Sequence, residues 1–199
     1  MTSAQLARVI FRHLQGTWKL ERTLKSTNTF EPSGKCYGSA SFSPRPVTNV
    51  EGQVAVEEML YEEHGDFEIS LPGNTGYSNP RLTFSRKYIW RLGAQEEPSI
   101  SVWFTKPGTE ELDYLFHEQD LGATTCCDSS FVTSAAQAHG SHLCVDDLYE
   151  TNYHYDLIDA AQFEEATISQ WSTSHTVKGP KKDQLITTNF TQKTLMVQR

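Results

Sequence analysis

The sequence lacks any long hydrophobic run. Charged or polar residues interrupt every apolar stretch before it reaches the roughly 20 residues that a membrane-spanning helix needs. The opening residues, MTSAQLARVIFRHLQG, also lack the apolar core and the small-residue cleavage site of a secretory signal. These absences predict a cytoplasmic protein with no membrane partner.

Clustered basic charge is missing as well. Lysine and arginine number 17 against 25 aspartates and glutamates, which gives a net charge of -8. A nucleic-acid partner would require a clustered basic surface that neutralises phosphates. The basic groupings are small, namely Lys178, Lys181 and Lys182 around one turn, and the isolated Arg86, Lys87 and Arg91. We therefore expect no nucleic-acid partner.

Motifs for cofactors and metals are also lacking. No phosphate loop, dinucleotide fingerprint, nucleophile elbow or haem-attachment motif occurs, so we expect no cofactor. His142 and Cys144 lie two apart and could supply two metal ligands from one strand face, but no second paired-ligand motif accompanies them. We predict no metal site. The four cysteines, Cys36, Cys126, Cys127 and Cys144, have no C-x-x-C spacing and are expected as free thiols.

What the sequence does have is alternation, which is clearest in the stretch GTWKLERTLKS from Gly16 to Ser26. A β-strand over this stretch places Trp18, Leu20, Arg22 and Leu24 on one face and polar residues on the other. One face is therefore apolar except for a single guanidinium. This arrangement is typical of the first strand of a closed barrel, whose other strands cover the indole and satisfy the charge.

Similar alternation recurs to the end of the chain, at residues 35–43, 53–63, 66–71, 81–92, 99–105, 112–117, 142–157, 166–177 and 184–192. We count about nine strands, most of them joined by short turns, which predicts an all-β, up-and-down antiparallel barrel. Residues 1–199 are long enough for one such domain. Within 142–157 the polar and aromatic side chains occur at both odd and even positions, so one regular strand could not point all of them inward. This predicts a bulge near Asp146.

Two other segments complete the predicted domain. Residues 3–15 carry Leu6, Val9, Ile10 and Leu14 at helical spacing, so we expect an amphipathic helix that packs on one end of the barrel; a helix for a partner would show the same pattern. Residues 121–140 are rich in Ser, Thr, Ala and Gly without clear periodicity, and we expect a long mobile loop.

Several motifs together carry a resemblance to a known family. They are Gly16-Thr17-Trp18 with Leu20 and Arg22, the stretch RKYIWR at 86–91, the stretch HLCVDDLY at 142–149, and GPKKD at 179–183. The chain resembles an uncharacterised lipocalin-like domain family of bacteria and fungi within the calycin superfamily. The resemblance implies that Trp18 closes one end of the barrel beneath a cation from the last strand. Phe190 is followed by Gln192 where that cation is expected, so Lys193 or Arg199 would take its place.

Arg22 and Arg86 are the first candidates for function, because a guanidinium inside a barrel must be paired or must face a polar cavity. Pairing with Glu58, Glu62 or Asp147 would make either arginine structural. Otherwise the guanidinium would anchor a carboxylate, phenolate or enolate of a ligand. Tyr88 and Trp90, on the face of Arg86, together with Tyr153 and Cys144, complete the expected ligand-binding set.

Asp147 and Tyr149 lead the candidate catalytic set, which also contains His142 and His175. An aromatic-lined cavity raises the pKa of a carboxyl group, so that Asp147 could act as general acid or base while phenols stabilise an oxyanion. A His142–Cys144 nucleophile pair is the less favoured arrangement, since no oxyanion site is recognisable. The structural alternative is that these tyrosines are ordinary strand formers whose hydroxyl groups reach water.

Two functions follow for a barrel that binds a small organic molecule, partly aromatic or apolar, with an oxygen-bearing polar end. The first is a cofactor-independent acid/base enzyme, an isomerase, cyclase or lyase, acting on a small organic substrate such as a secondary metabolite. The second is a non-catalytic carrier or sensor of a small hydrophobic ligand. The Arg, Tyr, Asp and His content of the predicted interior favours the enzyme.

Overall fold

The computed structural model describes residues 2–28, 31–70, 79–122, 125–126, 133–158, 167–180 and 182–192. One helix comes first, α1 (Ser3–Leu14), and every later element is a strand. The strands are β1 (Gly16–Ser26), β2 (Gly34–Arg45), β3 (Ala55–Ile69), β4 (Arg81–Gly93), β5 (Ile100–Thr105), β6 (Leu112–Leu121), β7 (Thr125–Cys126), β8 (Thr133–Cys144), β9 (Asp147–Ile158), β10 (Thr167–Lys178) and β11 (Asp183–Gln192).

The predicted fold class is confirmed, as an all-β chain with a short N-terminal helix forms a closed antiparallel barrel. Among the described residues the strand order is β6-β5-β4-β3-β2-β1-β11-β10-β9-β8-β7, and a β6–β8 pairing closes the ring. The barrel therefore has ten strands, close to the nine expected, and β7 adds two residues beside β8. Within these residues, no helix is long and apolar enough to span a membrane.

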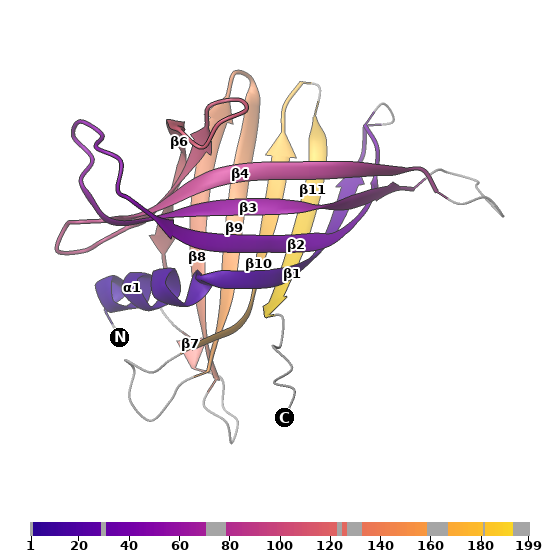
Figure 1. Ribbon diagram of the computed structural model, residues 1–199. Coiled ribbons are helices and arrows are strands. Elements are labelled where there is room, and N and C mark those ends of the chain that lie inside the picture. The colour runs from indigo at the N-terminus through magenta and orange to yellow at the C-terminus, as the bar shows by residue number, and fades with distance from the viewer. Residues whose placement is uncertain are drawn as a thin grey trace, which may run out of the picture.

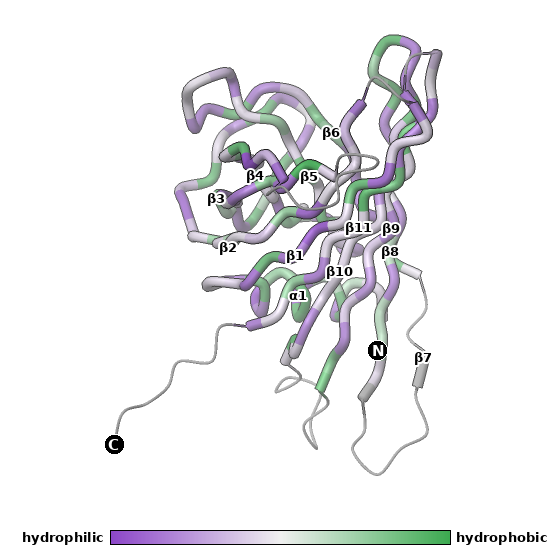
Figure 2. The backbone as a smooth tube through the Cα atoms, turned by 90° about the vertical axis from the view of Figure 1, so that its right-hand side faces the viewer, coloured by the Kyte–Doolittle hydropathy of each residue, from purple (hydrophilic) through white to green (hydrophobic). Residues whose placement is uncertain are grey.

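The strands lie in two directions. In Figure 1, β2 to β4 run across the view while β8 to β11 run nearly at right angles behind them. Figure 2, turned by 90°, shows β2 to β4 from their ends and hydrophilic and hydrophobic positions alternating along the strands. This crossing of two sheet faces is the orthogonal type of sheet packing, in which the inner faces share one core.

Helix α1 covers one end of the barrel. Its N-terminus is capped by Thr2, whose side chain accepts a hydrogen bond from the backbone of Gln5 while the Gln5 side chain accepts one from the backbone of Thr2. Its apolar face is buried against the barrel end, as expected, through Leu6, Ala7, Ile10, Phe11 and Leu14. The helix thus packs on the chain's own barrel and stabilises the closed end through apolar burial.

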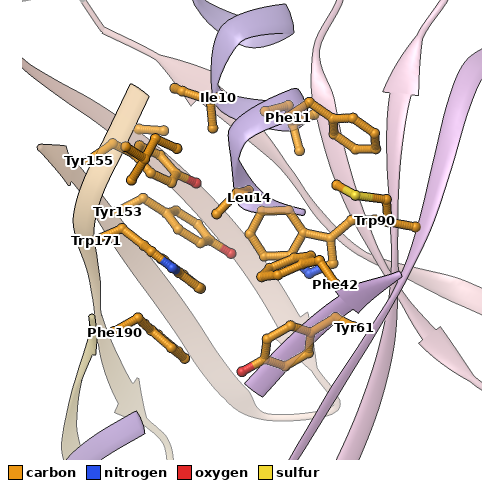
Figure 3. Packing of buried hydrophobic residues seen from close by; sticks show 14 of the residues in the cluster. Ile10, Phe11, Leu14, Phe42, Tyr61, Trp90, Tyr153, Tyr155, Trp171 and Phe190 are labelled. Atoms are coloured by element: carbon orange, nitrogen blue, oxygen red, sulfur yellow. The ribbon is translucent and has the colours of Figure 1, made fainter. Parts of the chain in front are cut away.

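Beneath α1 lies a layer of aromatic side chains (Figure 3). The buried Trp18 donates its indole N–H to the carbonyl of Leu14 at 2.8 Å, which ties the first strand to the helix. Trp171 stacks on Phe190 with ring centroids 3.7 Å apart, and Trp90 meets Trp171 edge to face. These rings form the floor of the barrel interior. The two predicted caps of Trp18, Lys193 and Arg199, lie outside the described residues.

Two predictions in the second half of the chain are wrong. Residues 142–157 form a hairpin and not one bulged strand, because the chain turns at Val145-Asp146 and Cys144 pairs with Asp147. The turn reverses the chain and so resolves the parity conflict. In the predicted loop 121–140, the residues from Thr133 onward are strand. They begin β8, and their small side chains belong to a strand that pairs with β9. The side chains of Cys126 and Cys127 lie outside the described residues.

The third strand is also longer than predicted. β3 runs without interruption through Gly65 and Asp66, where the sequence predicted the end of one strand, 53–63, and the start of another, 66–71. Gly65 instead lies opposite Gly38 of β2, and a Cβ atom built on Gly38 would meet the carbonyl oxygen of His64 at 2.1 Å. The paired glycines therefore permit an approach of the two backbones that no side chain would allow.

Outside the barrel, a second cluster forms on β3, β4 and β5. Leu60, Ile89 and Trp103 are its apolar members. Glu58, only 2% exposed, forms ion pairs with Arg91 and Arg45, each with an N–O distance of 3.1 Å. Glu58 is therefore paired with arginines on the outer face of the barrel, and the prediction that it could pair with Arg22 is wrong.

Candidate ligand-binding cavity

A cavity of about 450 Å³ lies inside the barrel, and the exposed lining residues Arg86 and Cys144 mark its mouth, whereas the buried Trp90 and Trp171 mark its floor. Of the ten residues proposed from the sequence, nine line it: Arg22, Arg86, Tyr88, Trp90, His142, Cys144, Tyr149, Tyr153 and His175. They come from strands β1, β4, β8, β9 and β10, so the barrel brings together residues that are far apart in the chain. The volume falls in the range of small-molecule sites.

Arg22 is held by an ion pair deep in this cavity. Its guanidinium donates to both carboxylate oxygens of Glu63, at 2.8 and 2.7 Å, and its Nε donates to Thr188 at 2.8 Å. The Tyr61 hydroxyl donates to the same carboxylate at 2.6 Å. Burial would raise the pKa of Glu63, but the bonds from Arg22 and Tyr61 outweigh it and hold that pKa below its ordinary value. The partner of Arg22 is thus Glu63, and the predicted partners Glu62 and Asp147 are wrong.

Arg86 differs from Arg22 in its partners. Among the described residues no carboxylate forms an ion pair with it, and the residue reaches solvent at the mouth of the cavity while its side chain lines the cavity wall. Interaction with Tyr88, two residues away on the same strand face, raises the pKa of Arg86, against the opposing effect of burial. The guanidinium is therefore charged and has donors available to a ligand.

His175 is held in the cavity wall as a neutral imidazole. Its Nδ1 lies 2.8 Å from the Thr151 hydroxyl on the neighbouring strand. Burial first, and the positive charge of Arg22 second, lower the pKa of His175 to about 4. At neutral pH this ring can therefore take part in hydrogen bonds but carries no charge.

His142 lines the upper wall among aromatic rings. It stacks on Tyr114 with centroids 6.2 Å apart and meets Phe116 edge to face at 5.3 Å. Tyr149, the next wall residue across the hairpin, lies 6.4 Å from the same ring. His142 and Cys144 do share a face, as expected, and the Cys144 thiol is free. Within the described part of the chain, no three His, Cys, Asp or Glu residues are grouped in a way that could hold a metal ion.

A buried polar network adjoins the cavity at Tyr153, and the sequence did not indicate it. His117 bonds the Tyr153 hydroxyl at 2.7 Å, and the Tyr155 hydroxyl donates to Gln119 at 2.9 Å. Burial lowers the pKa of His117 to about 3, so it is neutral. A register shift between β5 and β6 turns His117 and Gln119 inward, and such a shift is not readable from alternation alone.

Asp147 is the proposed residue that does not line the cavity. Its carboxylate forms an ion pair with Lys182 at 2.9 Å, and Lys182 also donates to the Tyr149 hydroxyl at 2.8 Å. The turn that carries Gly179 lies so close that a Cβ there would meet the Asp147 carboxylate at 1.9 Å. Asp147 therefore joins the β10–β11 turn to the start of β9 and is not grouped with Tyr153.

Fold and cavity together define a small antiparallel barrel with an internal ligand-sized site. A family model matches residues 14–192, which is most of the chain. The chain thus belongs to DUF6314, a family of unknown function. A search of curated proteins found no match.

Proposed function

We propose that the barrel binds a small organic molecule, partly aromatic or apolar, with an oxygen-bearing polar end. The observation that carries this proposal is the interior cavity of about 450 Å³, whose floor is aromatic and whose wall carries hydrogen-bonding groups. Trp90, Trp171 and Phe190 offer flat apolar surfaces to a ring or chain. Arg86, His175 and Tyr149 offer polar contacts nearer the mouth.

Binding is tested with N-phenyl-1-naphthylamine, a neutral aromatic dye whose fluorescence rises in apolar sites. Ile186 lines the cavity, whereas its neighbour Leu185 is 43% exposed. Ile186→Trp should fill the cavity and reduce dye affinity at least tenfold, whereas Leu185→Trp, the matched outer-face control, should leave it unchanged. Dye binding that is equal in both variants, or absent from the wild type, would contradict a cavity site.

A cofactor-independent acid/base enzyme, of isomerase, cyclase or lyase type, is the second candidate function. It is favoured by one observation: two histidines, His142 and His175, line the same cavity as Tyr149. An imidazole in its neutral form can accept a proton from a substrate and return it. Asp147 would take part only if its ion pair with Lys182 opened.

Catalysis and carriage are separated by native mass spectrometry with extracted metabolites. A retained ligand whose mass, or whose chromatographic retention after release, changes in the wild type, and not in His175→Gln or His142→Gln, would support the enzyme. A ligand that the wild type retains unchanged would support the carrier or sensor. Both variants keep a neutral hydrogen-bonding side chain, so loss of conversion would report on proton transfer.

The finer relationship to the lipocalin-like calycins of bacteria and fungi is also a proposal. It is supported by Gly16-Thr17-Trp18 at the start of β1 and by the indole packed at the closed end. A cytoplasmic location is likewise proposed, and the described thiols of Cys36 and Cys144 are free, as suits a reducing compartment.

A further inference from the structure

We propose that the ligand is an organic monoanion whose acid group binds Arg86 at the mouth of the cavity while its apolar body points to the Trp90 and Trp171 floor. This inference rests on the proposed function and names the class of ligand. It also assigns different roles to the two arginines that the sequence left equivalent.

The charges on the cavity wall are not balanced. The arginine, lysine, aspartate and glutamate residues that line it are Arg22, Arg86 and Glu63, so two guanidinium groups face one carboxylate. Because His175 is neutral, it adds no further positive charge at neutral pH. Counted over arginine, lysine, aspartate and glutamate, the cavity therefore carries one excess positive charge, although the whole chain has a net charge of -8. One negative charge on a ligand would neutralise it.

The acid group of the ligand does not bind Arg22. Both of its terminal nitrogens donate to Glu63 and its Nε donates to Thr188, so its inward donors are engaged. A ligand anion at Arg22 would also have to approach the Glu63 carboxylate, which is 2% exposed, and the like charges would repel.

Arg86 has the opposite properties. No carboxylate of the described residues forms an ion pair with it, although Glu63 acts on it at longer range, and it lies on the same inward face of β4 as Tyr88 and Trp90. Its planar fork of donors matches the two oxygens of a carboxylate or sulfonate. A phenol at Tyr88 beside it can supply another hydrogen bond to the same oxygens.

The positions along β4 set the orientation and length of the ligand. Arg86 is exposed at the mouth, whereas Trp90 is 4% exposed and Trp171 is 3% exposed at the floor. Four residues at about 3.3 Å per residue place the Arg86 and Trp90 positions roughly 13 Å apart along the strand. A two-ring aromatic acid, or a chain of similar length, therefore spans from guanidinium to floor with its apolar end inward.

The test is displacement of N-phenyl-1-naphthylamine by two matched competitors, 2-naphthoate and its neutral counterpart 2-naphthamide. We expect 2-naphthoate to displace the dye at a concentration roughly tenfold or more below that of 2-naphthamide, since hydrogen bonds to a charged group are the stronger kind. Arg86→Met should abolish this difference. Lys87→Met, which removes a charge from the next, outward-facing residue, should preserve it, because Lys87 instead pairs with Glu62 and Glu110.

Each outcome decides one question. Equal displacement by both competitors in the wild type, or a preference that survives in Arg86→Met, would overturn the anion site while leaving cavity binding intact. Absence of dye binding, or dye binding unaffected by Ile186→Trp, would instead overturn the proposed function. The wild-type comparison needs no variant, so the inference stays open to refutation even where Arg86→Met does not fold. Circular dichroism shows whether each variant is folded.

Discussion

Arg22 on β1 and Glu63 on β3 form a bidentate ion pair across the intervening strand, with N–O distances of 2.8 and 2.7 Å. Their side chains are 13% and 2% exposed, so the pair is nearly withdrawn from water. On the intervening strand, Gly38 lies between Cys36, which is opposite Arg22, and Ala40, which is opposite Glu63. A structural charge pair is thus part of the cavity wall.

Removing one member of this pair should destabilise the fold more than removing both. Arg22→Met leaves a buried, uncompensated carboxylate, and we expect a loss of about 3 kcal/mol in the free energy of unfolding. Arg22→Met combined with Glu63→Leu should recover part of this loss. Urea unfolding of the wild type, both single variants and the double variant measures the coupling. Losses that simply add would show that the two groups do not depend on each other.

Acid should destabilise the protein through His117. Burial lowers the pKa of His117 to about 3, against 6.5 for the ordinary side chain, so the unfolded chain binds a proton that the folded chain does not. The stability from the neutral ring is complete above pH 6.5 and is lost as the pH falls toward 3, at about 1.4 kcal/mol per pH unit. Urea unfolding between pH 7 and 4 measures this slope.

The matched variants for this pH effect are His117→Gln and His139→Gln. His117→Gln should reduce the slope by about one proton, whereas His139→Gln, at an exposed position, should not. His175, whose pKa is about 4, contributes in the same direction and remains in both variants. Identical slopes in the wild type and His117→Gln would refute the buried neutral histidine.

Gly38→Ala should be costly. Its new methyl group would meet the His64 carbonyl oxygen at 2.1 Å and the Gly65 Cα at 2.8 Å, so two strand backbones must separate. We expect a loss of roughly 2 kcal/mol or more. Gly122→Ala is the control, because its nearest contact would be 3.6 Å. A thermal midpoint for Gly38→Ala as high as that of Gly122→Ala would contradict the close approach.

Val145→Asn should stabilise the protein. Val145 has a φ of 57°, a left-handed conformation that is unfavourable for a β-branched residue, and it is 85% exposed, so little packing is lost. Asparagine tolerates this conformation in two-residue hairpin turns, and the expected gain is about 1 kcal/mol. Val54→Asn, at another exposed valine without a positive φ, should change stability little. Chemical unfolding that ranks the two variants equally would count against the strain.

Asp147→Asn should have a small effect on stability and none on cavity binding. The ion pair with Lys182 is partly exposed, so its loss costs at most about 1 kcal/mol. The carboxylate does not line the cavity, and the affinities for N-phenyl-1-naphthylamine and 2-naphthoate should stay within about twofold of the wild type. A larger loss of 2-naphthoate affinity would place Asp147 in the site after all.

Alternation alone predicted much of the cavity wall. It placed Arg22 on the inner face of β1, and Arg86, Tyr88 and Trp90 on the inner face of β4, where the structure has them. Glu63 lies inside the predicted strand 53–63, but it was missed as the partner of Arg22 because the two residues lie on strands separated by β2, and alternation within one strand does not indicate such a contact. The sequence did offer one indication, because Glu63 lies two residues after Tyr61 and therefore shares its strand face.

The β8–β9 hairpin could not be predicted from local sequence. Its turn uses Val145, a residue that the turn conformation disfavours, so the usual Asn-Gly signal is absent. The strand that precedes it contains Ala, Ser and Gly, which have low strand propensity, and it forms because β9 pairs with it along its length. Pairing with β9 therefore determines that this segment is a strand, which its own residue preferences do not indicate.

The β1–β11 pairing also determines how the barrel must fold. Arg22 and Thr188, bonded across this pair, are 166 residues apart in the chain, so the ring closes through its most distant segments. Neighbouring hairpins can form through local contacts, but this closure must first overcome the entropy of a long loop. Such non-local closure is typical of slow-folding all-β proteins. The last contacts to form would then include those that hold Arg22 in place, so the cavity would be completed only when the two ends of the chain have met.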